Sequence, residues 1–217
     1  MRPRVTLKLA TSLDGRIATA SGESQWITGQ EARAEGHRLR ASHDAILIGV
    51  GTALADDPQL TVRQPGLEDH QPARIVLDSR QRLSPGSKLA LTARESPVIV
   101  LTVLAPAPAL VRAGVEVIQV HAGRDGRPSL THVLTALQGR GLISLLVEGG
   151  GEVAGSFLRG DFVDRLEWFR APILLGAEGR PCVAPLELAK LDAAPKFRRV
   201  SAEAVGDDLW ERYDAVR

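Results

Sequence analysis

Short apolar runs alternate along the chain with stretches whose spacing and end signals are those of helices. Strands are typically short runs rich in branched apolar residues, whereas helices bury residues three or four positions apart. Because strands separated by helices are usually parallel and covered on both faces, we expect an α/β fold with a mixed, mostly parallel sheet flanked by helices. The predicted strands are 5–10, 45–50, 74–78, 98–103, 115–120, 143–148, 166–170 and 197–216. The predicted helices are 29–41, 52–57, 106–113, 129–138 and 152–159.

Several element ends carry recognisable signals. Thr28 followed by Glu31 has the spacing of a capping box, and Ser129 has the position of an N-cap. The turn-forming residues 206–208 divide the last apolar run, which predicts antiparallel strands at the C-terminal end. The segment QPGLEDHQP at 64–72 predicts a surface loop.

Composition excludes several classes of protein. The 217 residues suit one domain or two small ones, and we expect a single domain, 1–217. A net charge of +1 predicts no nucleic-acid partner. The single cysteine, Cys182, excludes an internal disulfide, and we interpret it as a small apolar residue rather than a nucleophile. No apolar run suggests a membrane span or a signal peptide, so we expect a cytoplasmic protein.

Two polar segments, 13–28 (LDGRIATASGESQWIT) and 54–63 (LADDPQLTVR), stand out between the apolar runs. Loops dense in Asp, Ser, Thr, Trp and Arg usually carry binding groups on a rigid scaffold. They predict a small-molecule enzyme.

The glycine cluster 149–151 lies between a predicted strand and a predicted helix. Such a turn brings backbone amides close to a phosphate. Gly149, Gly151 and Ala154 have the G-x-G-x-x-A spacing, but too few strand–helix units follow for a dinucleotide-binding domain of the Rossmann type. The alternative is a tight turn with no ligand. We favour phosphate binding, because three glycines exceed what a turn needs.

Five segments together carry a resemblance to a known family. The chain resembles the reductase domain of the bacterial riboflavin-biosynthesis deaminase/reductase, a relative of dihydrofolate reductase. The matching segments occur in the family's order and span most of the chain: KLATSLDG (8–15), SGESQWIT (21–28), LADDPQLTVR (54–63), VLDSR (76–80) and VEGGG (147–151).

The resemblance implies an NADPH-dependent reduction of 5-amino-6-(5-phosphoribosylamino)uracil. The ribose opens and hydride from nicotinamide C4 reaches C1′, which gives the phosphoribitylamino product. The resemblance also implies an active site at the carboxyl ends of the central strands and a homodimer.

The resemblance assigns substrate roles to individual residues. Arg40 and Arg63 would form a clamp on the substrate phosphate, although either could be a solvated surface arginine. Glu148 would meet the pyrimidine or the ribose, or else be a cap or a member of an ion pair. Lys8 would polarise the sugar or donate a proton, or else be an edge lysine pointing to water. The substrate contacts are Ser24, Arg40, Leu60, Arg63 and Glu148, and the catalytic candidates are Lys8, Asp56 and Glu148.

A second set of residues is implied to contact NADPH. Trp26 would pack on the nicotinamide end, although tryptophan is more often core. Asp57 could be a helix-end carboxylate or a turn carboxylate. Arg80 and Arg82 lie where the adenosine 2′-phosphate would bind. The implied contacts are Ala10, Trp26, Thr52, Asp56, Ser79, Gly150, Gly151, Glu152, Val153, Ala154, Gly155 and Ser156.

The deaminase half of the bifunctional enzyme has no counterpart here. None of the five histidines is followed by x-Glu, and one cysteine cannot complete the zinc site. The chain is therefore a free-standing reductase or a fragment, with a separate deaminase possible. Open alternatives are reduction of the non-deaminated diaminopyrimidine, reduction of a dihydrofolate or pterin, and a non-catalytic nucleotide-binding protein.

Overall fold

The computed structural model describes residues 2–217. The chain divides into two compact units. The first unit is Arg38–Leu146 with the N-terminal residues up to Arg4, and the second is Val5–His37 with Val147–Arg217. Helix α1 (Gln30–Ala41) and strand β7 (Ser144–Gly149) run from one unit into the other.

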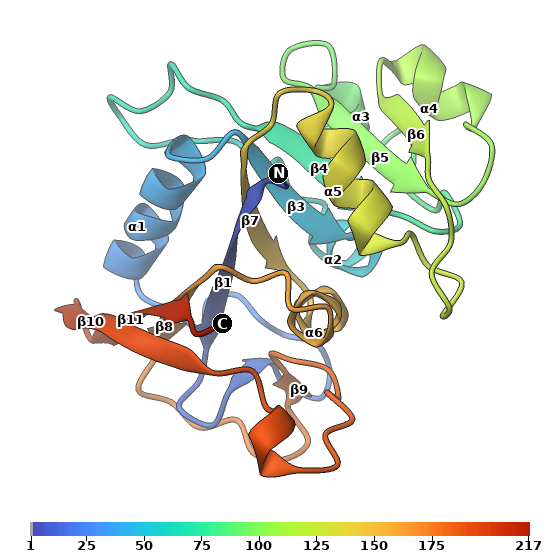
Figure 1. Cartoon of the computed structure of the whole chain (residues 1–217). Coiled ribbons are helices and arrows are strands. Elements are labelled where there is room, and N and C mark those ends of the chain that lie inside the picture. Colours follow the sequence, from blue (N-terminus) through green and yellow to red (C-terminus); the bar gives the residue numbers. More distant parts are fainter. Residues whose placement is uncertain (1) are drawn as a thin grey trace. The chain divides into compact units, whose positions relative to one another are not determined.

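The first unit is built on parallel strands (Figure 1). Strand β3 pairs with β4, β4 with β5 and β5 with β6, all in parallel, as expected for strands joined by helices. The elements are β3 (Ala45–Gly49), α2 (Val50–Asp56), β4 (Ala73–Leu77), α3 (Lys88–Leu91), β5 (Val98–Thr102), α4 (Pro108–Ala113), β6 (Glu116–Gln119) and α5 (Leu130–Gln138).

Both faces of these strands are covered. On one face Ile46, Val76 and Val100 belong to a buried cluster with residues of α2, α3 and α4. Helix α5 lies over the other face and buries Val133 and Leu137 (Figure 1). Burial on both faces explains why β3 and β5 read as continuous apolar runs.

The second unit combines a parallel and an antiparallel arrangement. Strand β1 pairs in parallel with β8, while β11 pairs antiparallel with both β8 and β10. The rings of Phe169 and Trp210 stack on this sheet, with their centroids 5.2 Å apart. The elements are β1 (Arg4–Thr11), β2 (Arg16–Ala18), α6 (Gly151–Arg159), β8 (Arg165–Arg170), β9 (Arg180–Pro181), the short 3-10 helix η1 (Leu191–Ala193), β10 (Phe197–Val205) and β11 (Asp208–Ala215).

The architecture confirms the predicted fold class, a mixed and mostly parallel sheet with helices around it and antiparallel strands at the C-terminal end. The predicted turn at 206–208 also forms, with Gly206 at a φ of +61°. No helix in the described part of the chain combines the length and the apolar character needed to cross a bilayer.

Several helix starts differ from the prediction by one or two residues, and one predicted cap is not formed. Helix α1 begins at Gln30 rather than Gly29, and the Gly29 N–H donates to the Asp208 carboxylate over 2.7 Å. Helix α4 begins at Pro108 rather than at 106, because a proline fits best in the first turn. Ser129 occupies the N-cap position of α5, but its side chain makes no capping hydrogen bond, so the predicted cap is wrong in its chemistry.

Candidate active site

The predicted site residues are distributed over both units. The first unit holds Arg40, Thr52, Asp56, Leu60, Arg63 and Ser79. The second unit holds Lys8, Ala10, Ser24, Trp26, Glu148 and the seven residues 150–156.

In the first unit, one irregular segment carries Arg63 and is contacted by Arg40, the other predicted phosphate-binding arginine. Leu60 is buried with a φ of +56°, which bends the backbone sharply between Gln59 and Thr61. The Arg40 guanidinium on α1 donates to the Thr61 carbonyl over 3.3 Å. Arg63 is exposed, and its Nη1 lies 3.5 Å from the Gln59 side-chain oxygen. The structure therefore brings Arg40 to the segment that carries Arg63.

A fully buried arginine, Arg74, also contacts this segment, and the sequence did not identify it as part of the site. Arg74 begins the apolar run of β4, and it is 0% exposed. Its Nη1 donates to the Gln59 carbonyl over 3.1 Å and to the Thr92 hydroxyl over 2.8 Å, and its Nη2 donates to the carbonyls of Thr92 and Ser96. Burial lowers the pKa of Arg74. The only signal in the sequence was a charged residue beside four apolar ones.

Thr52 and Asp56 lie four residues apart on α2, on the same side of the helix. Desolvation raises the pKa of Asp56, although the residue is exposed at the end of the helix. The next residue, Asp57, is the C-cap and accepts a hydrogen bond of 2.9 Å from the Lys88 N–H. Asp57 is thus a helix-end carboxylate, as one of the two interpretations held.

Ser79 begins a turn that is built around a buried carboxylate. Asp78, 0% exposed, accepts hydrogen bonds from the N–H groups of Leu83, over 2.8 Å, and Arg80, over 3.4 Å. Because Asp78 holds both sides of the turn, Arg80 and Arg82 are displayed on its exposed surface. This arrangement suits recognition of a phosphate.

In the second unit, Lys8 lies on β1 beside Glu167 of β8. Lys8 is half-buried, and its ammonium group lies 5.7 Å from the centre of the Phe169 ring. The alternative of an edge lysine that points only to water is wrong. Ala10, two residues along β1, pairs with Phe169 and is also half-buried.

Glu148 comes near the end of β7, directly before the glycine turn into α6. Gly150 has a φ of +72°, which favours glycine. A Cβ on Gly151 would lie 2.6 Å from the Pro181 carbonyl oxygen, and one on Gly155 would lie 3.1 Å from Ala184. Close packing therefore explains glycine at positions 151 and 155 without any ligand. The first turn of α6 still presents backbone N–H groups, which favour anions.

The segment around Ser24 is polar and exposed, as expected. Trp26 is 68% exposed and stacks with the Arg33 guanidinium, 4.7 Å from the ring centre. The alternative that Trp26 is a core residue is wrong. An exposed indole that is held by a cation has a flat face available for a planar ligand.

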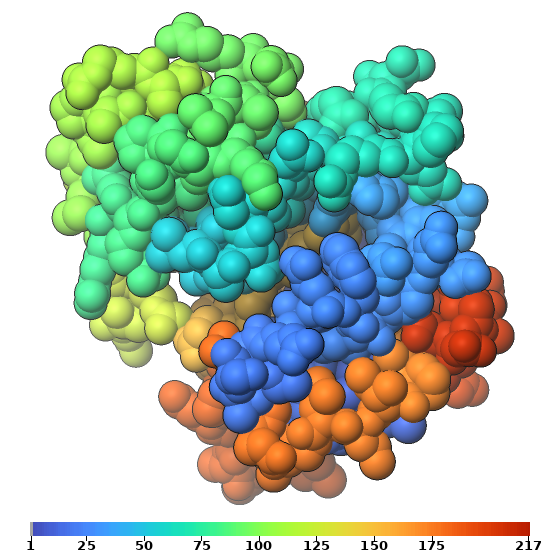
Figure 2. Space-filling model, turned by 180° about the vertical axis from the view of Figure 1, so that it is seen from behind, coloured from blue at the N-terminus to red at the C-terminus, as the bar shows by residue number. Residues whose placement is uncertain are grey.

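The same polar segment is joined to the loop after β8. Asp14 accepts hydrogen bonds from the Ser12 hydroxyl, over 2.6 Å, and from the N–H groups of Leu175 and Gly176, over 3.1 and 2.8 Å. These bonds, led by that of Ser12, lower the pKa of Asp14 to about 2. Figure 2 shows the blue N-terminal segment against the orange segment that contains Leu175.

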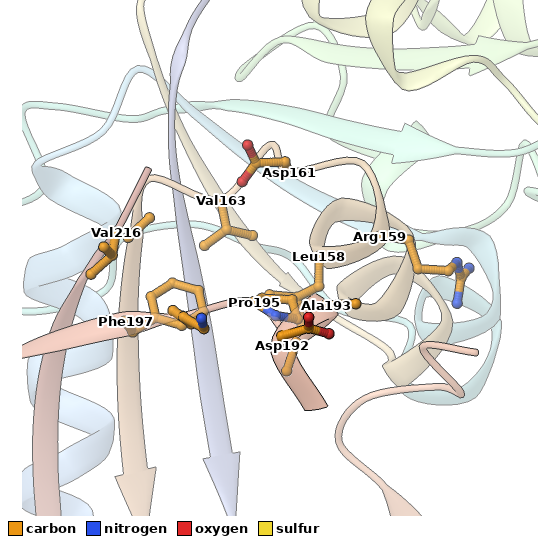
Figure 3. Close-up of a pocket in the computed structure, with 12 residues that line it drawn as sticks. Leu158, Arg159, Asp161, Val163, Asp192, Ala193, Pro195, Phe197 and Val216 are labelled. Carbon is orange, nitrogen blue, oxygen red and sulfur yellow. The ribbon is translucent and has the colours of Figure 1, made fainter. Parts of the chain in front are cut away.

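A cavity of about 330 Å³ lies in the second unit near the end of α6 (Figure 3). Its walls include the apolar side chains of Leu158, Val163, Phe197 and Val216. None of the residues that line it belongs to the predicted site. Within residues 2–217, no three His, Cys, Asp or Glu side chains are grouped as metal ligands.

Comparison with known proteins gives one consistent family. The model of the RibD C-terminal domain matches residues 3–210. The riboflavin biosynthesis protein RibD of Actinobacillus pleuropneumoniae is 38% identical over 221 residues, which cover 99% of this chain and 57% of that protein. The chain thus spans little more than half the length of this relative.

Solved structures agree with the sequence match. Acinetobacter baumannii RibD (form 2) superposes with a TM-score of 0.88 at 30% identity, over 99% of this chain and 58% of that one. The Thermotoga maritima diaminohydroxyphosphoribosylaminopyrimidine deaminase/5-amino-6-(5-phosphoribosylamino)uracil reductase superposes with a TM-score of 0.83 at 31% identity, over 99% and 57%. Because the family model covers nearly all its residues, this chain belongs to the RibD C-terminal domain family.

Proposed function

We propose that this chain is the NADPH-dependent reductase of 5-amino-6-(5-phosphoribosylamino)uracil in riboflavin biosynthesis. The Thermotoga maritima protein is named for this reductase activity, and this chain covers 57% of its length. The observation that carries the proposal is the arrangement of two arginines at the segment 59–63. Arg63 is exposed there, and Arg40 donates a hydrogen bond to the Thr61 carbonyl two residues before it. A planar guanidinium fork matches the oxygens of a sugar phosphate.

The residues fit the cofactor in two places, each within its own unit. In the second unit, the N-terminus of α6 offers backbone N–H groups to a pyrophosphate. In the first unit, Arg80 and Arg82 suit the 2′-phosphate that distinguishes NADPH from NADH. NADPH supplies the hydride for the reaction.

The protein side of the reaction concerns charge and protons. Opening of the ribose leaves a C1′=N imine and a C4′ hydroxyl. When hydride adds to C1′, one proton must reach the nitrogen. Lys8 is our candidate to supply that proton, since its ammonium group is half-buried beside an aromatic ring. Glu148 would orient the pyrimidine or the ribose, and Arg63 would hold the phosphate.

The test is NADPH oxidation, followed at 1:1 stoichiometry with product, on both the deaminated and the non-deaminated pyrimidine phosphates. We expect turnover of the deaminated substrate. Preferential turnover of the other substrate would change the substrate assignment, and oxidation only with dihydrofolate or a pterin would contradict the proposal. Cofactor binding without turnover of any of them would indicate a non-catalytic nucleotide-binding protein.

We also propose a homodimer and a cytoplasmic location. Strand β10 pairs with β11 on one side and ends the order of strands, and exposed edges favour pairing with another chain. Sedimentation at micromolar concentration should give twice the mass of the single chain, which is 23.2 kDa, whereas a monomer would refute the dimer.

The proposed cytoplasmic location rests on the single free cysteine, which suits a reducing compartment. A deaminase activity outside these residues would supply the substrate.

A further inference from the structure

The loop 64–72, expected only to be a surface loop, reaches back to the segment that carries Arg63. The side-chain amide of Gln71 makes two hydrogen bonds to one residue, Val62. Its oxygen accepts from the Val62 N–H over 2.9 Å, and its nitrogen donates to the Val62 carbonyl over 3.0 Å. The Gln71 amide therefore satisfies the N–H and the carbonyl of Val62, as the backbone of a paired β-strand would.

Side chains hold this whole stretch of backbone, because it belongs to no helix or strand. Arg74 binds the Gln59 carbonyl and Arg40 binds the Thr61 carbonyl. Gln71 binds both polar groups of Val62, a buried residue at 2% exposure. Buried backbone groups need partners, so the three side chains together specify one path for the segment.

Gln71 acts on the residue next to the proposed phosphate ligand. Val62 is fixed at its N–H and at its carbonyl, and the carbonyl carbon is bonded directly to the nitrogen of Arg63. A guanidinium that must meet a phosphate with two parallel hydrogen bonds depends on where its backbone starts. Without the two hydrogen bonds from Gln71 to Val62, Arg63 would sample more positions before it binds the phosphate, and fixing it would cost entropy.

We propose that Gln71 is a positioning residue for recognition of the substrate phosphate by Arg63. The inference rests on the proposed function, because it assumes a phosphorylated substrate. Glutamine suits the role, because its amide carries both a donor and an acceptor at one end.

The experiment compares Gln71→Ala and Gln71→Met with the wild type in steady-state kinetics. Methionine keeps the length and the apolar contacts but makes neither hydrogen bond. For the phosphorylated pyrimidine we expect both variants to raise KM by about three- to tenfold, with kcat within about twofold of the wild type. On the dephosphorylated nucleoside, all three proteins should perform alike. A merely structural defect would affect both substrates.

Gln119→Ala is the matched control. Gln119 also donates from its side chain to a backbone carbonyl, that of Val103, over 3.1 Å, and no proposed site residue lies on that strand. Its KM should equal that of the wild type. Hydrogen exchange gives a readout that needs no substrate: the Val62 amide should exchange at least tenfold faster in both Gln71 variants than in the control.

The outcomes separate the two proposals. If the wild type reduces neither pyrimidine phosphate, the proposed function is wrong. If the wild type is active and Arg63→Ala raises KM, but Gln71→Ala and Gln71→Met leave KM unchanged, only the positioning role is wrong. An equal rise in KM for both substrates, or unchanged exchange at Val62, would also overturn it.

Discussion

The indole N–H of Trp210 donates a hydrogen bond of 2.7 Å to the carboxylate of Glu167, which is 3% exposed. Glu167 lies beside Lys8 on one side and Arg212 on the other in the sheet of the second unit. Burial raises the pKa of Glu167, while the Trp210 bond and nearby arginines oppose the shift. The folded protein therefore holds a proton on Glu167 more tightly than the unfolded chain does.

This shift predicts a pH-dependent contribution to stability. A raised pKa gives stability that is fully present below the unfolded value near 4.5 and is lost as pH rises through the folded value. Glu167→Gln cannot ionise, so its Tm relative to the wild type should increase between pH 4.5 and 8. For a chain of this size, each 1 kcal/mol corresponds to about 2–4 °C. Thermal unfolding followed by circular dichroism checks this, and a constant difference across pH would contradict it.

The phosphate clamp predicts a selective loss of affinity. Arg63→Ala should raise KM for the phosphorylated substrate about ten- to a hundredfold and more, which corresponds to a loss of roughly 1.5–3 kcal/mol in binding free energy. NADPH binding should change little. Arg63→Lys should recover only part of the loss, because an ammonium group has no planar fork.

The dephosphorylated nucleoside is the control for Arg63→Ala, since wild type and variant should reduce it equally. Arg40→Ala tests a second role, because Arg40 also binds the Thr61 carbonyl. Unchanged KM in both arginine variants would remove the main chemical support for a phosphorylated substrate.

Cofactor choice should favour NADPH over NADH by about 1.5–3 kcal/mol in kcat/KM, roughly ten- to a hundredfold and more. Replacing both Arg80 and Arg82 with alanine should remove most of this preference without abolishing use of NADH. Arg112→Ala, another exposed arginine of the first unit, is the control. Equal kcat/KM for the two cofactors in the wild type would refute the assignment.

The packing of the glycine turn predicts a change in stability. In Gly151→Ala the new methyl group would meet the Pro181 carbonyl oxygen at 2.6 Å, so we expect a loss of about 1–3 kcal/mol in urea denaturation. Gly51→Ala, in α2, is the matched control, since a Cβ there meets nothing within 4 Å. That variant should be neutral or gain about 0.5–1 kcal/mol. Equal effects would show that the contact with Pro181 relaxes freely.

The sequence predicted the fold where one local pattern decided the structure. The run AILIG of β3 and the run IVL of β4 are apolar on both faces, so their strands lie within one residue of the prediction. The short helix α3 (Lys88–Leu91) and the two-residue strand β9 were missed, because such short elements depend on contacts made elsewhere in the fold.

For the candidate site, the motifs named the residues but not their surroundings. The exposure of Trp26 and the contact of Gly151 with Pro181 depend on partners distant in sequence. The role of Gln71 had no local signal either, because a glutamine in a polar loop looks the same whether or not its amide meets a backbone. Arg74 had a weak signal, a charge at the start of an apolar strand.

The lone thiol of Cys182 lies on the segment that covers the glycine turn. Cys182 is buried, and its N–H donates to the Gly15 carbonyl over 3.0 Å. The Ala184 N–H donates a hydrogen bond to the Gly151 carbonyl over 2.9 Å. Burial also raises the pKa of the thiol, so little reactive thiolate is present. A thiol reagent should therefore reach the buried Cys182 only when the packing around this segment opens locally. With no other cysteine in the chain to compete, the rate of labelling is a built-in measure of how often the segment that packs against Gly151 and Gly155 opens locally.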